Sequence, residues 1–268
     1  MVKPSEKIDV VFLHTAIHEL KTPLLAMKLI LEMVLDPKGE SLTQTQRDNL
    51  IDVAKSAEQT LAMVGDILAM AKAQDDNRMR SREFVNVHEL METLRNELQT
   101  LTTQKHLTVV WEGDPMACAA LLTHQESLRS IVQNLFTNAI KYNREGGTIT
   151  LRVATVDGKT ADIPPIFKAV KQALKKHASW CVVTVEDSGM GIPKEEQTKI
   201  FGRFFRASNI KTVDPYGTGL GLYLTKTLVE KLGGQIWFES PVRRSLGEGG
   251  EEGKGTAFSV ALPYMKKT

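Results

Sequence analysis

Residues 180–193 read Trp-Cys-Val-Val-Thr-Val-Glu-Asp-Ser-Gly-Met-Gly-Ile-Pro, a β-rich run that ends in an aspartate and two glycines. The run predicts a strand over 180–185 followed by a turn. Asp187, placed at the end of that strand, can accept a hydrogen bond from an exocyclic amine, and Gly189 and Gly191 let backbone approach a flat ligand. The pattern is weak evidence of function by itself, because turns after strands use the same residues.

The chain around this run alternates between strand-like and helix-like segments from Phe84 onward. Further strands are expected at 107–111, 148–154, 235–239 and 256–262, and helices at about 86–104, 124–142 and 219–232, the last closed by Gly233-Gly234. Two segments look inserted, 157–177 (with a short amphipathic helix over 166–177) and 245–254. The alternation predicts an α/β sandwich in which one mixed sheet carries helices on one face.

Two further motifs have the chemistry of a polyphosphate site. Asn134, Asn138, Lys141 and Tyr142 fall on one face of a helix, where amide oxygens can ligate Mg²⁺ and the lysine can neutralise phosphate. An exposed helix with ordinary polar residues explains this stripe equally well. The segment 217–222, Gly-Thr-Gly-Leu-Gly-Leu, opens a helix and exposes amides at its positive end, and 207–216 before it is a candidate lid. It is neither a Walker nor a Rossmann sequence.

The first 75 residues carry a different pattern, a seven-residue repeat that is typical of helices packed along a left-handed seam. Residues 36–39, Asp-Pro-Lys-Gly, separate two such series, and Thr43 with Gln46 has the spacing of a capping box. The series predict a hairpin of two long helices; their members are Leu13, Ile17, Leu20, Leu24, Met27, Leu31 and Val34, then Leu50, Ala54, Ala57, Leu61, Val64, Leu68 and Ala71.

Two helices cannot enclose a core, and further apolar residues widen both stripes (Leu25, Ile30, Met33, Ile51, Met63 and Ile67). We therefore expect two chains to pair their hairpins into a four-helix bundle. The homodimer would form through residues of about 8–72.

His18 lies on the first helix in the sequence His-Glu-Leu-Lys-Thr-Pro. A lone histidine on a helix is usually a surface residue, but Glu19 could orient the imidazole and accept its proton, leaving the other nitrogen as a nucleophile. Pro23 predicts a kink one turn beyond His18. A metal site is improbable, because Thr22 replaces the second histidine of H-E-x-x-H and His14 with His18 supplies only two ligands.

Composition excludes several classes of protein. The chain has 268 residues, 34 basic and 32 acidic, and this net charge of +2 is too small to indicate binding to nucleic acid or to a membrane surface. Charges interrupt the longest apolar stretches, so no membrane span is expected. The first residues, MVKPSEK, lack the apolar core of a secretory signal. Cys118 and Cys181 are far apart in the sequence and in no metal spacing, which suits a reducing cytoplasm.

Taken together, the motifs resemble those of the sensor histidine kinases of two-component signalling. HELKTP is similar to the H-box, NLFTNAIKY to the N-box, EDSGMGIP to the G1-box, IFGRFFR to the F-box and GTGLGL to the G2-box, in the family order. The resemblance covers about residue 8 to the end. It implies a dimerisation and histidine-phosphotransfer domain (1–75), a hinge (76–83) and a Bergerat-type ATP-binding domain (84–268).

The resemblance also implies roles for individual residues in a kinase that uses ATP and Mg²⁺. His18 would take the γ-phosphoryl group with Glu19 as base, Thr22 would belong to a motif for dephosphorylating the partner, and Arg206 would stabilise transferred charge. Asn138 would ligate Mg²⁺, and Asp187 would bind the adenine amino group. The other nucleotide-binding residues would be Asn134, Lys141, Tyr142, Gly189, Gly191, Ile192, Gly217, Thr218, Gly219, Leu220, Gly221, Leu222 and Thr256.

The implied partner is the receiver domain of a response regulator, and the implied location is cytoplasmic, as a separate protein or as the cytoplasmic part of a larger sensor. Two rivals remain. A gyrase- or MutL-like ATPase would need a water-activating glutamate four residues before Asn138, where this chain has Asn134, an amide that cannot act as a base. A dimeric adaptor without activity would have no need of intact motifs, although a phosphatase-dominant protein would have the same sequence features.

Overall fold

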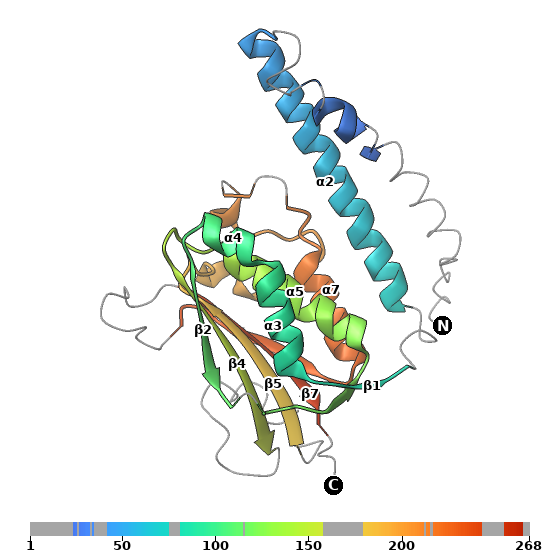
Figure 1. Cartoon of the computed structure of the whole chain (residues 1–268), viewed down its shortest axis with the longest axis vertical. Coiled ribbons are helices and arrows are strands. Elements are labelled where there is room, and N and C mark those ends of the chain that lie inside the picture. Colours follow the sequence, from blue (N-terminus) through green and yellow to red (C-terminus); the bar gives the residue numbers. More distant parts are fainter. Residues whose placement is uncertain are drawn as a thin grey trace.

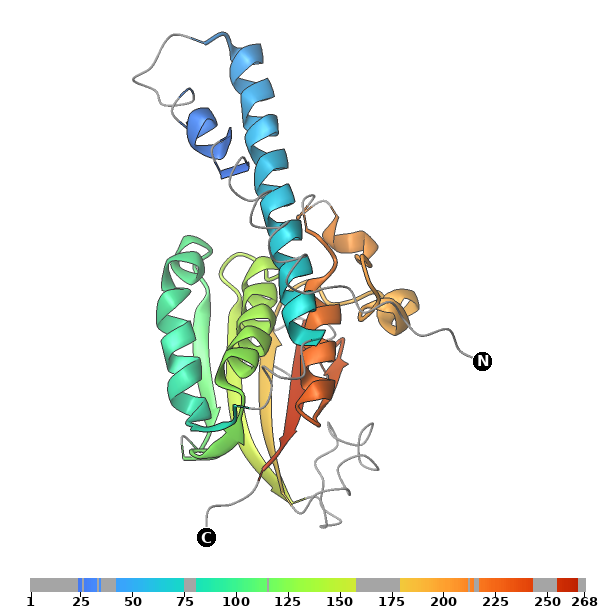
Figure 2. The ribbon, with the colours of Figure 1, turned by 90° about the vertical axis from the view of Figure 1, so that its right-hand side faces the viewer.

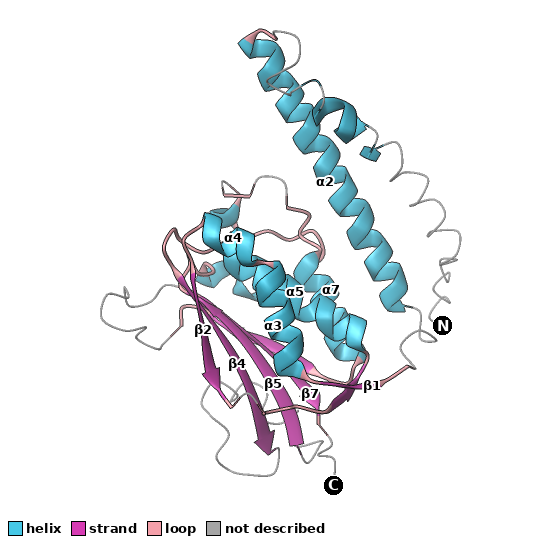
Figure 3. Cartoon of the chain, in the orientation of Figure 1, coloured by secondary structure: helices cyan, strands magenta, loops and turns pink. Residues whose placement is uncertain are grey.

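The computed structural model describes residues 24–25, 27–32, 34, 42–74, 81–114, 116–157, 179–211, 213–214, 217–242 and 255–264. The C-terminal part is a five-stranded sheet with helices on one face (Figure 1, Figure 3). Strands β2 (Thr108–Gly113), β4 (Thr148–Asp157), β5 (Ser179–Asp187), β7 (Thr256–Pro263) and β6 (Gln235–Glu239) follow one another across it. β2 and β4 are parallel and the other neighbours antiparallel, which confirms the predicted mixed sheet.

Of the described helices, four cover the sheet: α3 (Val87–Glu97), α4 (Gln99–Gln104), α5 (Gln125–Lys141) and α7 (Gly221–Lys231). The single helix expected at 86–104 is two helices, because the chain leaves the helical conformation at Leu98. Asn86 and His124 cap α3 and α5 by accepting backbone N–H groups. After α7, Gly234 N donates to Val229 O at 2.9 Å, so the two glycines close this helix as predicted.

A short antiparallel pair, β1 (Glu83–Val85) with β3 (Leu121–Thr123), was not expected from the sequence. Strands of three residues are too short to show a periodic pattern. β1 also bears on the predicted hinge at 76–83. Residues 75–80 lie outside the described part of the chain, but Glu83 already pairs with Thr123, so the end of that segment belongs to the α/β part.

β5 lies in the middle of the sheet and is buried along almost its whole length. Cys181, Val183 and Val185 face the helices and join the main core with residues of α5 and α7. Trp180 and Val182 point to the other face and form a second cluster with Val156, Trp237 and Ala261. Burial on both faces explains why β5 reads as a nearly continuous apolar run rather than as an alternating one.

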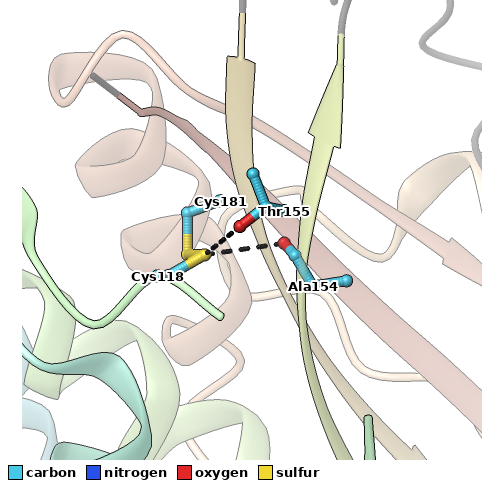
Figure 4. The surroundings of a disulfide bond; sticks show 4 residues. All are labelled: Cys118, Ala154, Thr155 and Cys181. Carbon is cyan, nitrogen blue, oxygen red and sulfur yellow. Dashed lines mark hydrogen bonds between the residues drawn. A yellow bond between two sulfur atoms is a disulfide. The ribbon is translucent and has the colours of Figure 1, made fainter. Parts of the chain in front are cut away.

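Cys118 and Cys181 form a disulfide (Figure 4), which their spacing in the sequence, interpreted above as suiting a reducing cytoplasm, did not predict. Their Cα atoms are 5.7 Å apart although 63 residues separate them in sequence. The turn after β2 brings Cys118 over β5, next to Ala154 and Thr155 of β4. The sequence could not show this pairing, because it arises from the fold of the turn onto the sheet rather than from a local motif.

The N-terminal part contains α2 (Gln44–Gln74), which extends past the α/β domain and lies beside α7 at its C-terminal end (Figure 1, Figure 2). Thr43 N donates to Gln46 Oε1 at 3.0 Å and Gln46 N to Thr43 Oγ1 at 3.3 Å, which confirms the predicted capping box. The described residues within 24–34 are helical, and Lys28 Nζ lies 2.9 Å from Glu58 Oε1 of α2, as two arms of a hairpin require. Among the described helices, none is long and apolar enough to cross a membrane.

Residues 158–177 and 245–254 of the segments that looked inserted lie outside the described residues, and so does Pro23, where the kink is expected.

The disulfide is expected to stabilise the α/β part of the chain. Closing a loop of 63 residues lowers the entropy of the unfolded chain by an amount worth up to about 4 kcal/mol. Adding a thiol reductant should therefore lower the urea midpoint of the wild type, followed by circular dichroism. The Cys118→Ala/Cys181→Ala variant is the control, because its midpoint should not respond to reductant. Two titratable thiols in wild-type protein unfolded without reductant would contradict the prediction.

Candidate nucleotide-binding site

Two neighbouring cavities lie between α5, the N-terminus of α7 and the ends of β5 and β7. The first, here the apolar cavity, is lined by Asn138, Tyr142, Asp187, Gly191, Ile192, Ile200, Phe205, Arg206, Ala207, Ile210, Leu222, Thr256 and Phe258. The second, here the polar cavity, shares seven of these residues and adds Asn134, Lys141, Asp214, Gly217, Thr218, Gly219 and Gly221 among others. An apolar recess beside a polar one suits a ligand with a flat ring and a charged tail.

Asp187 closes the apolar cavity at the end of β5 and is only 7% exposed. The backbone N–H of Gly189 donates to its Oδ1 at 2.8 Å, and the N–H of Thr256, its partner residue on β7, donates as well. Burial raises the pKa of Asp187 from 3.8 to about 7, with these two donors opposing the rise. When ionised, a buried carboxylate of this kind is a strong hydrogen-bond acceptor for a ligand amine.

Lys141 and Tyr142, at the C-terminal end of α5, converge on one carboxylate, that of Asp214. Lys141 Nζ lies 2.7 Å from Asp214 Oδ2, and the Tyr142 hydroxyl donates to the same oxygen at 3.1 Å. Burial and the charge of Asp214 raise the pKa of Tyr142, so its hydroxyl remains a hydrogen-bond donor. Arg206 Nη2 is 3.8 Å from that oxygen, which places two cations around one buried anion.

Asn134 fixes α5 to the start of α7. Its Nδ2 donates to Thr225 Oγ1 at 2.7 Å, and a Cβ atom added to Gly221 would lie 2.6 Å from its Oδ1. A side chain at position 221 would therefore have to push the Asn134 amide aside. The contact brings the glycine segment 217–221 to the wall of the polar cavity, at the N-terminus of α7. Backbone N–H groups at a helix N-terminus lack partners within the helix and suit an anion.

Most of the residues predicted from the sequence thus meet at one site. Two of them line neither cavity. Gly189 donates its backbone N–H to the Asp187 carboxylate, and Leu220 is buried in the protein interior. His18, Glu19 and Thr22 lie outside the described residues, so their distance from the site is untested.

Three functional candidates escaped the sequence analysis. Asp214 is one, and the only signal was an acidic residue three positions before Gly217. Lys105 is the second: its Nζ donates to the carbonyls of Ile140 and Lys141 at 3.0 and 2.7 Å, which caps α5 beside the polar cavity. Ser240 is the third, since its Oγ joins Ile192 N to Gly255 O. Contacts over such sequence separations leave no local pattern.

The comparisons with known proteins agree with this geometry. Residues 123–266 match the family described as "Histidine kinase-, DNA gyrase B-, and HSP90-like ATPase", and residues 11–76 match "His Kinase A (phospho-acceptor) domain". The chain belongs to the histidine kinases. This membership confirms the predicted fold class, a phospho-acceptor helical domain followed by an ATPase-type α/β domain.

Named relatives include the sensor histidine kinase WalK of Bacillus subtilis (strain 168), 26% identical over 96% of this chain and 37% of the relative. The sensor protein GacS of Pseudomonas syringae pv. syringae is 29% identical over 98% of this chain and 26% of its own length. The chain thus spans well under half of these relatives. Full-length ShkA in complex with AMPPNP shares the fold, with a TM-score of 0.64 over 97% of this chain and 47% of that one at 23% identity.

The raised pKa of Asp187 predicts a pH-dependent stability. Between about pH 4 and 7 the folded protein keeps a proton that the unfolded chain has lost, so the free energy of unfolding falls as pH rises through this window. Across this window the free energy of unfolding of the wild type should fall by up to about 4 kcal/mol relative to that of Asp187→Asn, at about 1.4 kcal/mol per pH unit. Urea unfolding at several pH values measures this difference, with the exposed Asp114→Asn as control. Parallel curves for wild type and Asp187→Asn would contradict the assignment.

Proposed function

We propose that this histidine kinase binds ATP in the two cavities, transfers the γ-phosphoryl group to His18 and passes it to an aspartate of a receiver domain. The observation that carries the proposal is the position of Asp187, a buried carboxylate in an apolar recess that opens toward Lys141, Arg206 and a glycine segment. An adenine amino group would bind Asp187, and the phosphates would lie in the polar cavity. Thr256 and Ile192 line the recess that would enclose the ring.

The residues of the site suit a magnesium ion that arrives with the nucleotide. Among the described residues, no cluster of three His, Cys, Asp or Glu side chains could hold a metal. Asn138, which lines both cavities, offers one amide oxygen. Mg²⁺ typically takes one or two protein oxygens and completes its shell with water and substrate phosphates. Asn138 would hold the ion, and the ion would neutralise phosphate charge.

The chain's own residues would perform the remaining work. Lys141 and Arg206 would bind the phosphates, Tyr142 would donate a hydrogen bond to them, and the amides of the segment 217–221 would orient them. Glu19 would accept the proton of His18 while the other ring nitrogen attacks the γ-phosphorus. Thr22 would assist the removal of phosphate from the receiver domain.

The rival activity, hydrolysis of ATP by a gyrase-like mechanism, needs a general base at position 134. The amide of Asn134 bonds to Thr225 and has no carboxylate to offer. This observation favours transfer to the histidine over hydrolysis.

A homodimer through residues of about 8–72 would pair the helical hairpins of two chains. Leu31, Ala57 and Val64 are buried in the single chain, whereas Leu25, Ile30 and Val53 remain at least 45% exposed. A second hairpin would cover this stripe in a four-helix bundle.

Incubation with γ-labelled ATP and Mg²⁺ tests the kinase proposal. We expect the wild type to acquire label that is stable in alkali and lost in acid, as a phosphoramidate is, and His18→Gln to acquire none. His14→Gln is the matched control, four residues earlier in the sequence, and should be labelled like the wild type.

Two outcomes would refute the assignment of His18. One is label of normal amount on His18→Gln, and the other is a wild-type protein that binds ATP but acquires no label. Circular dichroism and ATP binding measured on each variant separate a lost acceptor from a misfolded protein.

A further inference from the structure

Asp214 occupies the place where the proposed function puts the phosphates of ATP. It is 7% exposed and lies in the wall of the polar cavity, where its carboxylate contacts three residues assigned above to phosphate binding: Lys141, Tyr142 and Arg206. A carboxylate that takes two cations and a hydroxyl donor makes the same contacts as a phosphate oxygen. In the absence of nucleotide, Asp214 is therefore the anionic partner of Lys141 and Arg206 and the hydrogen-bond acceptor of Tyr142.

The backbone of the glycine segment confirms the position of this carboxylate. A Cβ atom added to Gly217 would lie 2.4 Å from Asp214 Oδ2 and 3.3 Å from Arg206 Nε. The oxygen thus lies directly against the first glycine of the segment whose amides would bind phosphate. A side chain at position 217 would displace either the carboxylate or the guanidinium.

Electrostatics makes simultaneous occupancy unfavourable. A phosphate bound by Lys141 and Arg206 would lie within a few ångströms of the carboxylate, and two anions at that distance in a partly buried site repel strongly. The side chain of Arg206 is only 16% exposed and that of Asp214 8%, so water screens this repulsion poorly. Nucleotide must therefore exchange with Asp214 for the same partners.

We propose that Asp214 is an internal competitor of ATP: its carboxylate occupies the phosphate subsite, and ATP binds by displacing it from Lys141 and Arg206. The inference rests on the proposed nucleotide site. It assigns Asp214 a role in setting the affinity for the phosphate tail, separate from recognition of the adenine by Asp187.

Equilibrium binding of ATP and of adenosine, which has no phosphates, tests the inference. Asp214→Asn keeps the shape of the side chain and removes its charge, so the Kd for ATP should fall roughly tenfold, the equivalent of about 1.4 kcal/mol. The Kd for adenosine should change less than about twofold, because adenosine does not need the carboxylate to move. Asp114→Asn, exposed and outside both cavities, is the control for the change in net charge and should leave both values unchanged.

A second variant separates competition from a general effect on the domain. In a Lys141→Gln background one of the two cations for which the anions compete, and the one nearer to Asp214, is missing, so the gain from Asp214→Asn should shrink to less than half of its value on the logarithmic scale. An equal gain in both backgrounds would overturn the inference.

The remaining outcomes are equally decisive. If Asp214→Asn binds ATP no better than the wild type while adenosine still binds, Asp214 is not a competitor and the proposed site stands. If wild type and Asp214→Asn bind neither ATP nor adenosine, the proposed nucleotide site fails and the inference fails with it.

Discussion

The burial of Asp187 at the end of the central strand is the constraint on which the site depends. β5 has neighbours on both sides and is covered on both faces, so the chain carries this carboxylate out of water as it leaves the sheet. An unpaired buried carboxylate is costly, and the N–H groups of Gly189 and Thr256 reduce that cost. Both donors lie on segments that must pass close to β5: the turn that follows it and the first residue of β7.

The cost of burying a charge also shapes the polar cavity. Lys141 and Arg206 bring two positive charges to the wall of one cavity, and such charges need an anion nearby. Asp214 provides it in the free protein, and phosphate would provide it in the complex. The cations can therefore stay in position through both states, which is the preorganisation that electrostatic catalysis requires. The competing carboxylate lowers affinity for the nucleotide in exchange for this order.

The sequence predicted the features that repeat locally and missed those that arise from distant contacts. The β-rich run of β5, the capping box at Thr43 and the double glycine after α7 each lie within a few residues of sequence, and the structure confirms each of them. The break at Leu98 was missed because its flanks both favour helix.

The long-range contacts needed the fold. The Cys118–Cys181 disulfide and the contacts of Lys105 with the end of α5 join segments more than 30 residues apart, which no periodic pattern reveals. Asp214 could not be assigned for the same reason: its role follows from Lys141 and Arg206, which α5 and the segment after Phe205 bring to it. Motifs predicted which residues bind a ligand, and only the geometry indicates which residue competes with it.

The arrangement of the two halves links the site to signalling. α2 lies beside α7, the helix whose N-terminus carries the glycine segment and whose Thr225 holds Asn134 of α5. A rotation of the ATP-binding domain relative to the hairpin must therefore change a contact made by the helix that forms one wall of the polar cavity. The proposed function requires such a rotation, because it places the acceptor His18 and the nucleotide on different domains. The contact between α2 and α7 would then connect movement of the hairpin to the helix whose N-terminus is proposed to position the phosphates.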